Sequence, residues 1–126
     1  MNTPTIGAPK WSVFLTCIAL AIVTCVIILG SWTRLADAGL GCPDWPGCYG
    51  NLLVPETVEA IAAAEALYPD APVEAAKGWL EMIHRYFATL LGFIILVIAV
   101  SSWSQRKRLN YPFGLTQGLL AMVMLQ

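Results

Sequence analysis

The sequence is poor in charge and contains a single histidine. Only 12% of its 126 residues are charged and 58% are hydrophobic, whereas a soluble domain usually carries about 25% charged residues. This shortage excludes an ordinary soluble domain and indicates a membrane protein. No basic run with interleaved aromatic residues occurs, which argues against nucleic-acid binding. The acids are also confined, because all eight lie between Asp37 and Glu81.

Two apolar stretches are long enough to cross a bilayer. Residues 11–31 are uncharged and almost wholly apolar, close to the ~20 residues that a transmembrane helix needs. They exceed the roughly 7–15 residues of a signal-peptide core, so we favour a retained helix over a cleaved signal. Residues 80–105 form the second predicted span. Residues 113–126 are too short to cross, and we expect them to begin a third, truncated span, with a re-entrant segment as the alternative.

A basic cluster orients these spans. Residues 106–108 read Arg-Lys-Arg directly after the second span, and basic clusters in short loops stay on the cytoplasmic side. We therefore expect the N-terminal segment 1–10 and the loop 106–112 in the cytoplasm. The acidic loop 32–79 is expected outside it.

The acidic loop also contains helix signals. Residues 58–67 are rich in alanine and follow Pro55-Glu56-Thr57, which is typical of a helix start. A second start at Pro72 predicts a helix that continues into the membrane and ends near Gln105. The expected fold class is all-α: a polytopic membrane helix bundle with short helices in its outer loop.

Cys42 and Cys48 lie six residues apart in a stretch of the outer loop that is rich in proline and glycine. The compartment outside the cytoplasm permits disulfides. In the entropy model, a bridge that closes so short a loop stabilises the folded chain by roughly 2–3 kcal/mol. The pair is either a structural staple or redox-active. We favour the staple, since Cys-x-x-Cys is the usual redox spacing. A zinc site is disfavoured because the one histidine lies far along the chain.

The histidine itself, His84, stands three residues after Glu81 where the second span begins. Positions three apart share a helix face, and an ionisable residue at membrane depth indicates a functional site by default. A polar helix end reaching toward water is the alternative. Ala88 and Gly92 continue the face of His84, leaving room for a neighbouring helix or for a flat macrocycle. Because imidazole is a common iron ligand, heme is a candidate occupant.

Two arginines, Arg34 and Arg85, are expected at the outer edge of the membrane. Either is suited to pair with a heme propionate, since arginine forms charge-assisted and often bidentate bonds to carboxylates. The alternative for each is an interfacial anchor. Arg85 also lies four residues after Glu81, which favours an ion pair on one helix face.

Three of these segments together resemble the heme A synthase family of cytochrome oxidase assembly. They are the Thr-Arg-Leu turn at 33–35, the Cys-Pro-Asp-Trp-Pro loop at 42–46, and Glu-x-x-His-Arg at 81–85. The resemblance covers essentially the whole chain as the N-terminal part of a larger protein. It implies eight transmembrane helices in two similar four-helix bundles, and oxidation of the C8 methyl group of heme O to the formyl group of heme A.

The resemblance also implies roles for individual residues. His84 matches an axial ligand of heme iron, Glu81 matches an acid important for catalysis, and Cys42 and Cys48 match a loop pair that is disulfide-bonded in many members. Heme O is the implied substrate, and heme b is the implied cofactor of the second bundle. The remaining histidine ligands are expected beyond Gln126, so we expect these residues alone to be inactive.

The implied setting is a bacterial inner membrane. Candidate partners are the lipid bilayer, heme O synthase, cytochrome oxidase assembly factors and further copies of the chain. Two other classes of function stay open. One is a membrane thiol–disulfide oxidoreductase that uses Cys42 and Cys48 with a quinone, and the other is a non-catalytic assembly or anchoring subunit.

Overall fold

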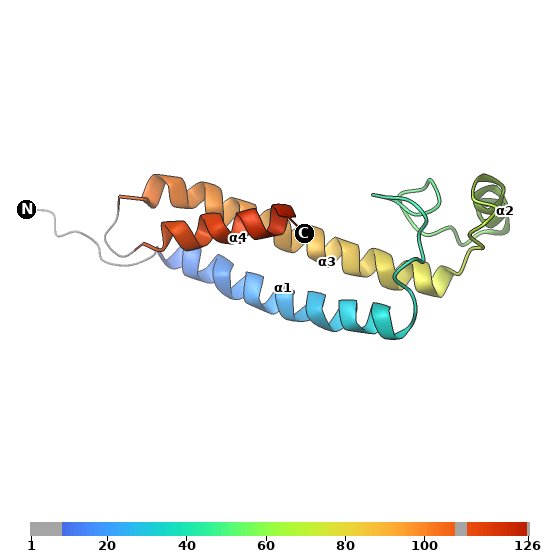
Figure 1. Cartoon of the computed structure of the whole chain (residues 1–126), viewed down its shortest axis with the longest axis horizontal. Helices are drawn as coiled ribbons and strands as arrows, with labels where there is room; N and C mark the ends of the chain where they lie inside the picture. Colours follow the sequence, from blue (N-terminus) through green and yellow to red (C-terminus); the bar gives the residue numbers. More distant parts are fainter. Residues whose placement is uncertain (1–8, 108–110, 126) are drawn as a thin grey trace, which may run out of the picture. The chain divides into compact units, whose positions relative to one another are not determined.

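The computed structural model describes residues 9–107 and 111–125 of the chain, and these residues build the expected all-α membrane helix bundle (Figure 1). Most of the expected cytoplasmic segment 1–10, and Arg108 of the basic cluster, lie outside the described residues. The helices are α1 (Lys10–Leu35), α2 (Val58–Leu67), α3 (Ala75–Gln105) and α4 (Phe113–Leu125).

Helices α1 and α3 are long and apolar enough to cross a membrane. They contain 26 and 31 residues, and their most apolar windows have mean hydropathies of 2.9 and 2.1. Large side chains of α1 such as Phe14, Leu20 and Ile27 are more than half exposed, at 65%, 61% and 62%. Exposure of this kind suits a helix surrounded by lipid. The chain is therefore a membrane protein.

Helix α3 is longer than a bilayer requires. At a rise of about 1.5 Å per residue, a helix of 31 residues is longer than the hydrocarbon core of a bilayer, which is about 30 Å thick. Its charged residues, Lys77, Glu81 and Arg85, all lie in its first eleven residues, and no further charge follows before Arg106. The first turns of α3 are thus the part suited to the membrane surface, where long charged side chains reach water.

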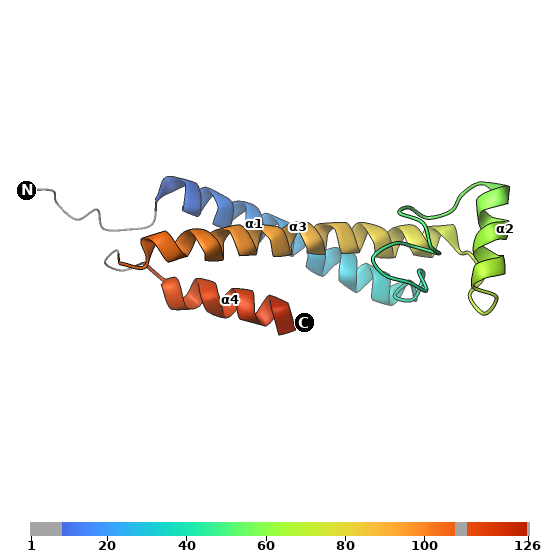
Figure 2. The ribbon, with the colours of Figure 1, turned by 90° about the horizontal axis from the view of Figure 1, so that it is seen from above.

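The chain divides into two compact units, one of residues 1–24 with 88–126 and one of residues 25–87. In the first unit, α4 runs beside the C-terminal half of α3 (Figure 2). Gln117 Nε2 on α4 donates to the carbonyl of Ala99 and to Ser102 Oγ on α3, both at 2.9 Å. Thr116 Oγ1 lies 2.9 Å from the same Ser102 Oγ. Because lipid gives apolar helices no hydrophobic reason to associate, such polar bonds help to join them.

In the second unit, α1 ends in a Schellman motif. The N–H of Ala38 donates to the carbonyl of Thr33 at 2.9 Å, and that of Asp37 to Arg34 at 3.3 Å. Asp37 adopts φ 50°, a left-handed conformation that aspartate tolerates better than most residues. The motif satisfies the last carbonyls of α1 and turns the chain into the loop.

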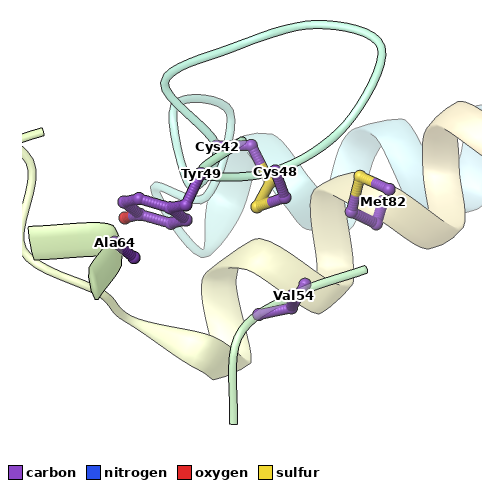
Figure 3. Close-up of a cluster of buried hydrophobic side chains, with 6 residues drawn as sticks. All are labelled: Cys42, Cys48, Tyr49, Val54, Ala64 and Met82. Carbon is purple, nitrogen blue, oxygen red and sulfur yellow. A yellow bond between two sulfur atoms is a disulfide. The ribbon is translucent and has the colours of Figure 1, made fainter. Parts of the chain in front are cut away.

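The loop and α2 enclose a small apolar core against the first turns of α3 (Figure 3). Its buried members are Cys42, Cys48, Tyr49, Val54, Ala64 and Met82. The Tyr49 hydroxyl donates to the carbonyl of Pro72 at 2.9 Å, and burial raises the pKa of this phenol above its usual 10.0. Thr57 precedes helix α2 as its N-cap, and its side chain accepts a hydrogen bond from the N–H of Ala60, as is typical of an N-cap.

The loop touches α3 backbone to backbone. A Cβ atom on Gly41 would lie 2.7 Å from the carbonyl carbon of Lys77 and 2.8 Å from the backbone nitrogen of Gly78. Only glycine permits this approach, because neither neighbouring atom belongs to a side chain that could turn away. By contrast, a Cβ atom on Gly39 would meet nothing within 4 Å.

We therefore predict that Gly41→Ala destabilises the second unit while Gly39→Ala does not. Forcing an extra methyl group into a tight contact typically costs about 1–3 kcal/mol, which lowers the unfolding temperature by several degrees. Thermal unfolding of the detergent-solubilised protein measures the difference. Equal unfolding temperatures for the two variants would contradict the backbone contact.

Candidate functional site

The sequence-predicted site lies in the second unit, where α3 presents Glu81, His84 and Arg85 within little more than one turn. Glu81 is buried, with 8% of its surface exposed, while His84 and Arg85 are half-buried. No hydrogen bond joins Glu81 to His84 among the described residues. The two side chains instead contact different neighbours, Glu81 the loop and His84 helix α1.

Both carboxylate oxygens of Glu81 accept hydrogen bonds. Oε2 accepts the backbone N–H of Cys42 at 3.0 Å, and Oε1 accepts Nη2 of Arg85. The side chains of this ion pair are 11% and 19% exposed. A buried charge is costly unless it is paired and hydrogen-bonded, and Glu81 meets both conditions.

Arg85 extends the same connection further into the loop. Its Nη1 donates to the carbonyls of Asp44 at 2.9 Å and of Gly47 at 2.8 Å. One planar guanidinium therefore joins Glu81 on α3 to two points of the loop, which a lysine ammonium cannot do with the same geometry. Both carbonyls lie between the two cysteines in sequence.

Cys42 and Cys48 form a disulfide, with their Cα atoms 4.8 Å apart. The carboxylate of Asp44 closes the same loop, accepting the N–H of Tyr49 at 2.6 Å and of Gly50 at 2.9 Å. The two cysteines are only 5% and 0% exposed. Because thiol–disulfide exchange needs access to sulfur, this burial favours the structural staple over a redox-active pair.

The imidazole of His84 faces Gly30 on α1. A Cβ atom on Gly30 would lie 2.9 Å from His84 Cε1, 3.4 Å from Nδ1 and 3.5 Å from Nε2. Nδ1 is buried, and none of the described residues forms a hydrogen bond with it. Since buried polar atoms in proteins are nearly always paired, an unpaired one calls for an explanation. A ring nitrogen that keeps its lone pair is what a metal ligand requires.

Arg34 and Arg85, which were expected to serve alike, differ in their surroundings. Arg34 is exposed in the last turn of α1, and its guanidinium makes no hydrogen bond within the described part of the chain. Arg85 already binds Glu81 and two loop carbonyls. Of the two, Arg34 has the freer guanidinium.

The structure adds Asp44 and Gly30 to the residues that the sequence suggested. Asp44 had a local signal, since an aspartate among prolines and glycines often bonds to nearby N–H groups in a turn. Gly30 had none. It lies in an apolar span, and only the register between α1 and α3 brings it to His84.

An apolar cavity of about 400 Å³ occurs in the first unit. Its lining includes Val13, Leu20, Leu91 and Leu115, and it includes neither Glu81 nor His84. It is therefore distinct from the candidate site.

Comparison with known proteins places the chain in a family. The family model described as cytochrome oxidase assembly protein matches residues 13–126. The heme A synthase of Shewanella oneidensis is 53% identical over 81 residues, which cover 64% of this chain and 24% of that protein. The heme A synthase of a Chelativorans species is 28% identical over 127 residues, covering 90% and 34%.

A more distant match is protoheme IX farnesyltransferase 1 of Natronomonas pharaonis, 26% identical over 80 residues, which cover 64% of this chain and 13% of that protein. No solved structure matches. The chain spans between 24% and 34% of the two heme A synthases described above. With the family model matching nearly all of its length, the chain belongs to the heme A synthase family of cytochrome oxidase assembly proteins.

Proposed function

We propose that the protein containing these residues is a heme A synthase, which oxidises the C8 methyl group of heme O to the formyl group of heme A. Each of two successive hydroxylations takes an oxygen atom from water and passes two electrons to an external acceptor with release of two protons. The resulting geminal diol loses water to leave the aldehyde. The observation that supports this most directly is the His84 imidazole, whose buried Nδ1 has no partner among the described residues and which faces a residue without a side chain. From membership of the heme A synthase family, heme iron is the metal that this imidazole is expected to bind.

The residues present fit a heme. His84 offers ring nitrogens free of hydrogen bonds to the described residues, and Arg34 offers an exposed guanidinium at the end of α1. In this proposal His84 would bind the iron and Arg34 would pair with a propionate, an interaction that suits its planar donors. The iron, when bound, supplies the redox chemistry. The proposal places the cofactor heme b in the second four-helix bundle of the family, which these residues do not include.

Glu81 is the proposed catalytic carboxylate. Its two oxygens are held by the Cys42 N–H and by Arg85, so the group is fixed before substrate arrives. A fixed carboxylate next to a reacting carbon can accept a proton or stabilise developing positive charge, and it needs no reorganisation to do so. In this proposal Arg85 positions Glu81 and does not bind a propionate.

The proposed setting is a bacterial inner membrane with the N-terminus and the 106–112 loop in the cytoplasm. The charged start of α3, which bears the site, then lies at the outer surface with the loop 32–79. This arrangement follows the positive-inside tendency and places the disulfide in a compartment that permits it.

The first prediction from the proposed function concerns heme A itself. The protein expressed from its whole gene with a source of heme O should yield heme A in a pyridine hemochrome assay. Glu81→Ala should abolish heme A while heme O stays bound, and His84→Ala should change the spectrum of the bound heme. Ile83→Ala, which alters an exposed residue next to His84 on the same helix, is the matched control and should behave as wild type.

Absence of any heme A from the wild-type protein would reject the proposed activity. If Glu81→Ala left function unaffected and His84→Ala changed no heme spectrum, the non-catalytic anchoring subunit would become the better interpretation.

The second prediction separates a heme enzyme from a thiol–disulfide oxidoreductase. Replacing Cys42 and Cys48 together by serine should lower stability by roughly 2–3 kcal/mol, the entropy-model value for so short a loop, and leave part of the heme A formation. Replacing the two free, exposed cysteines, Cys17 and Cys25, should change neither. Complete loss of turnover in a folded Cys42/Cys48 variant would favour the oxidoreductase.

The third prediction contrasts the two arginines. Arg85→Lys should lower both the unfolding temperature and heme A formation, because the donors of a compact ammonium cannot reproduce the planar arrangement by which the guanidinium reaches Glu81 and two carbonyls. Arg34→Lys should weaken heme binding and leave the unfolding temperature unchanged. Heme titration and thermal unfolding of the detergent-solubilised protein measure both effects. An Arg85→Lys protein as stable as wild type would show that Arg85 does not hold the loop.

A further inference from the structure

The His84 ring meets Gly30 along the edge that bears both nitrogens. The three ring atoms nearest to the missing Cβ position of Gly30 are Cε1, Nδ1 and Nε2, at 2.9, 3.4 and 3.5 Å. Either ring nitrogen of an imidazole can bind a metal. The direction in which this edge of the ring points therefore decides whether His84 can bind one.

No hydrogen bond from the described residues to Nδ1 fixes that direction. Histidines that bind metals usually donate their second ring N–H to a carboxylate, a carbonyl or water, and this bond sets the ring orientation. Nδ1 of His84 is buried, and no described residue accepts from it or donates to it. The close approach of the ring to the backbone of α1 at Gly30 is a steric constraint on that direction.

A side chain at position 30 would act on this ring more than on the helix. A separation of 2.9 Å is closer than Cβ atoms come to other atoms in proteins, so either the ring or α1 must shift. The ring is the end of a side chain with two rotatable bonds and can turn to another rotamer. Alanine is also a better helix former than glycine, so Gly30→Ala should not disrupt α1 itself.

We propose that Gly30 is a positioning residue for the His84 imidazole, and that its lack of a side chain sets the orientation in which His84 binds heme iron. This inference rests on the proposed function, because it assumes that His84 is an iron ligand. It goes beyond that proposal by assigning a role in ligation to a residue of α1 that bears no polar group.

The test is Gly30→Ala in the protein expressed from its whole gene. The absorption and electron paramagnetic resonance spectra of the bound ferric heme report on the axial ligand independently of activity. Gly30→Ala should shift both spectra and lower heme retention through purification by tenfold or more. Gly118→Ala is the matched control, because Gly118 also lies in a helix and a Cβ atom there would meet nothing within 4 Å.

Spectra of Gly30→Ala identical to wild type would overturn the inference while leaving the proposed function intact, provided that His84→Ala still changes them. A His84→Ala protein with unchanged spectra would instead overturn ligation by His84, and the role of Gly30 with it.

A double-mutant cycle keeps the inference testable if Gly30→Ala folds poorly. Without the imidazole, the added methyl group has no ring to meet. In a His84→Ala background, Gly30→Ala should therefore leave the unfolding temperature unchanged or raise it. An equal loss of unfolding temperature in both backgrounds would mean that Gly30 serves only the packing of α1, and the inference would fail.

Discussion

The Arg85 guanidinium is the contact on which the second unit depends. It donates to two carbonyls of the disulfide loop and to the carboxylate of Glu81. Backbone carbonyls shielded from water need partners, and those of Asp44 and Gly47 have theirs on α3. Glu81 in turn receives the N–H of Cys42. Loop and helix therefore satisfy each other's polar groups, and neither arrangement would persist without the other.

Because loop and helix depend on each other, the disulfide has a structural role beyond closing a short loop. The bridge and the Asp44 carboxylate hold the loop backbone in a shape that places one N–H and two carbonyls opposite α3. Glycine at position 41 lets that backbone lie directly on the helix. Two sequence motifs far apart in the chain, Cys-Pro-Asp-Trp-Pro and Glu-x-x-His-Arg, thus become one structure. The first supplies backbone groups and the second supplies side chains.

Local signals in the sequence predicted the helices well. Composition and run length indicated the apolar helices, and Pro55-Glu56-Thr57 indicated the start of α2, which begins after Thr57. The pairing of Arg85 with Glu81 also followed from their spacing of four. Contacts between residues far apart in the sequence did not follow from local signals. Nothing near Gly30 points to His84, and the sequence made Arg34 and Arg85 alike candidates for a heme propionate. Such contacts depend on the register of helices whose apolar surfaces permit many registers, so only the folded chain distinguishes them.

Glu81 and His84 are held in opposite ways, and the difference suits the roles proposed for them. Glu81 has both oxygens hydrogen-bonded, so its position is fixed by polar contacts that leave little freedom. His84 lies with its ring against a glycine, and its buried Nδ1 has no hydrogen-bond partner among the described residues. Histidines that bind metals are usually oriented by a hydrogen bond from the second ring nitrogen, and no described residue forms one with Nδ1 of His84. The close approach of Gly30 to the ring is a steric constraint in its place, so the position of the imidazole depends on packing, whereas that of the carboxylate depends on hydrogen bonds.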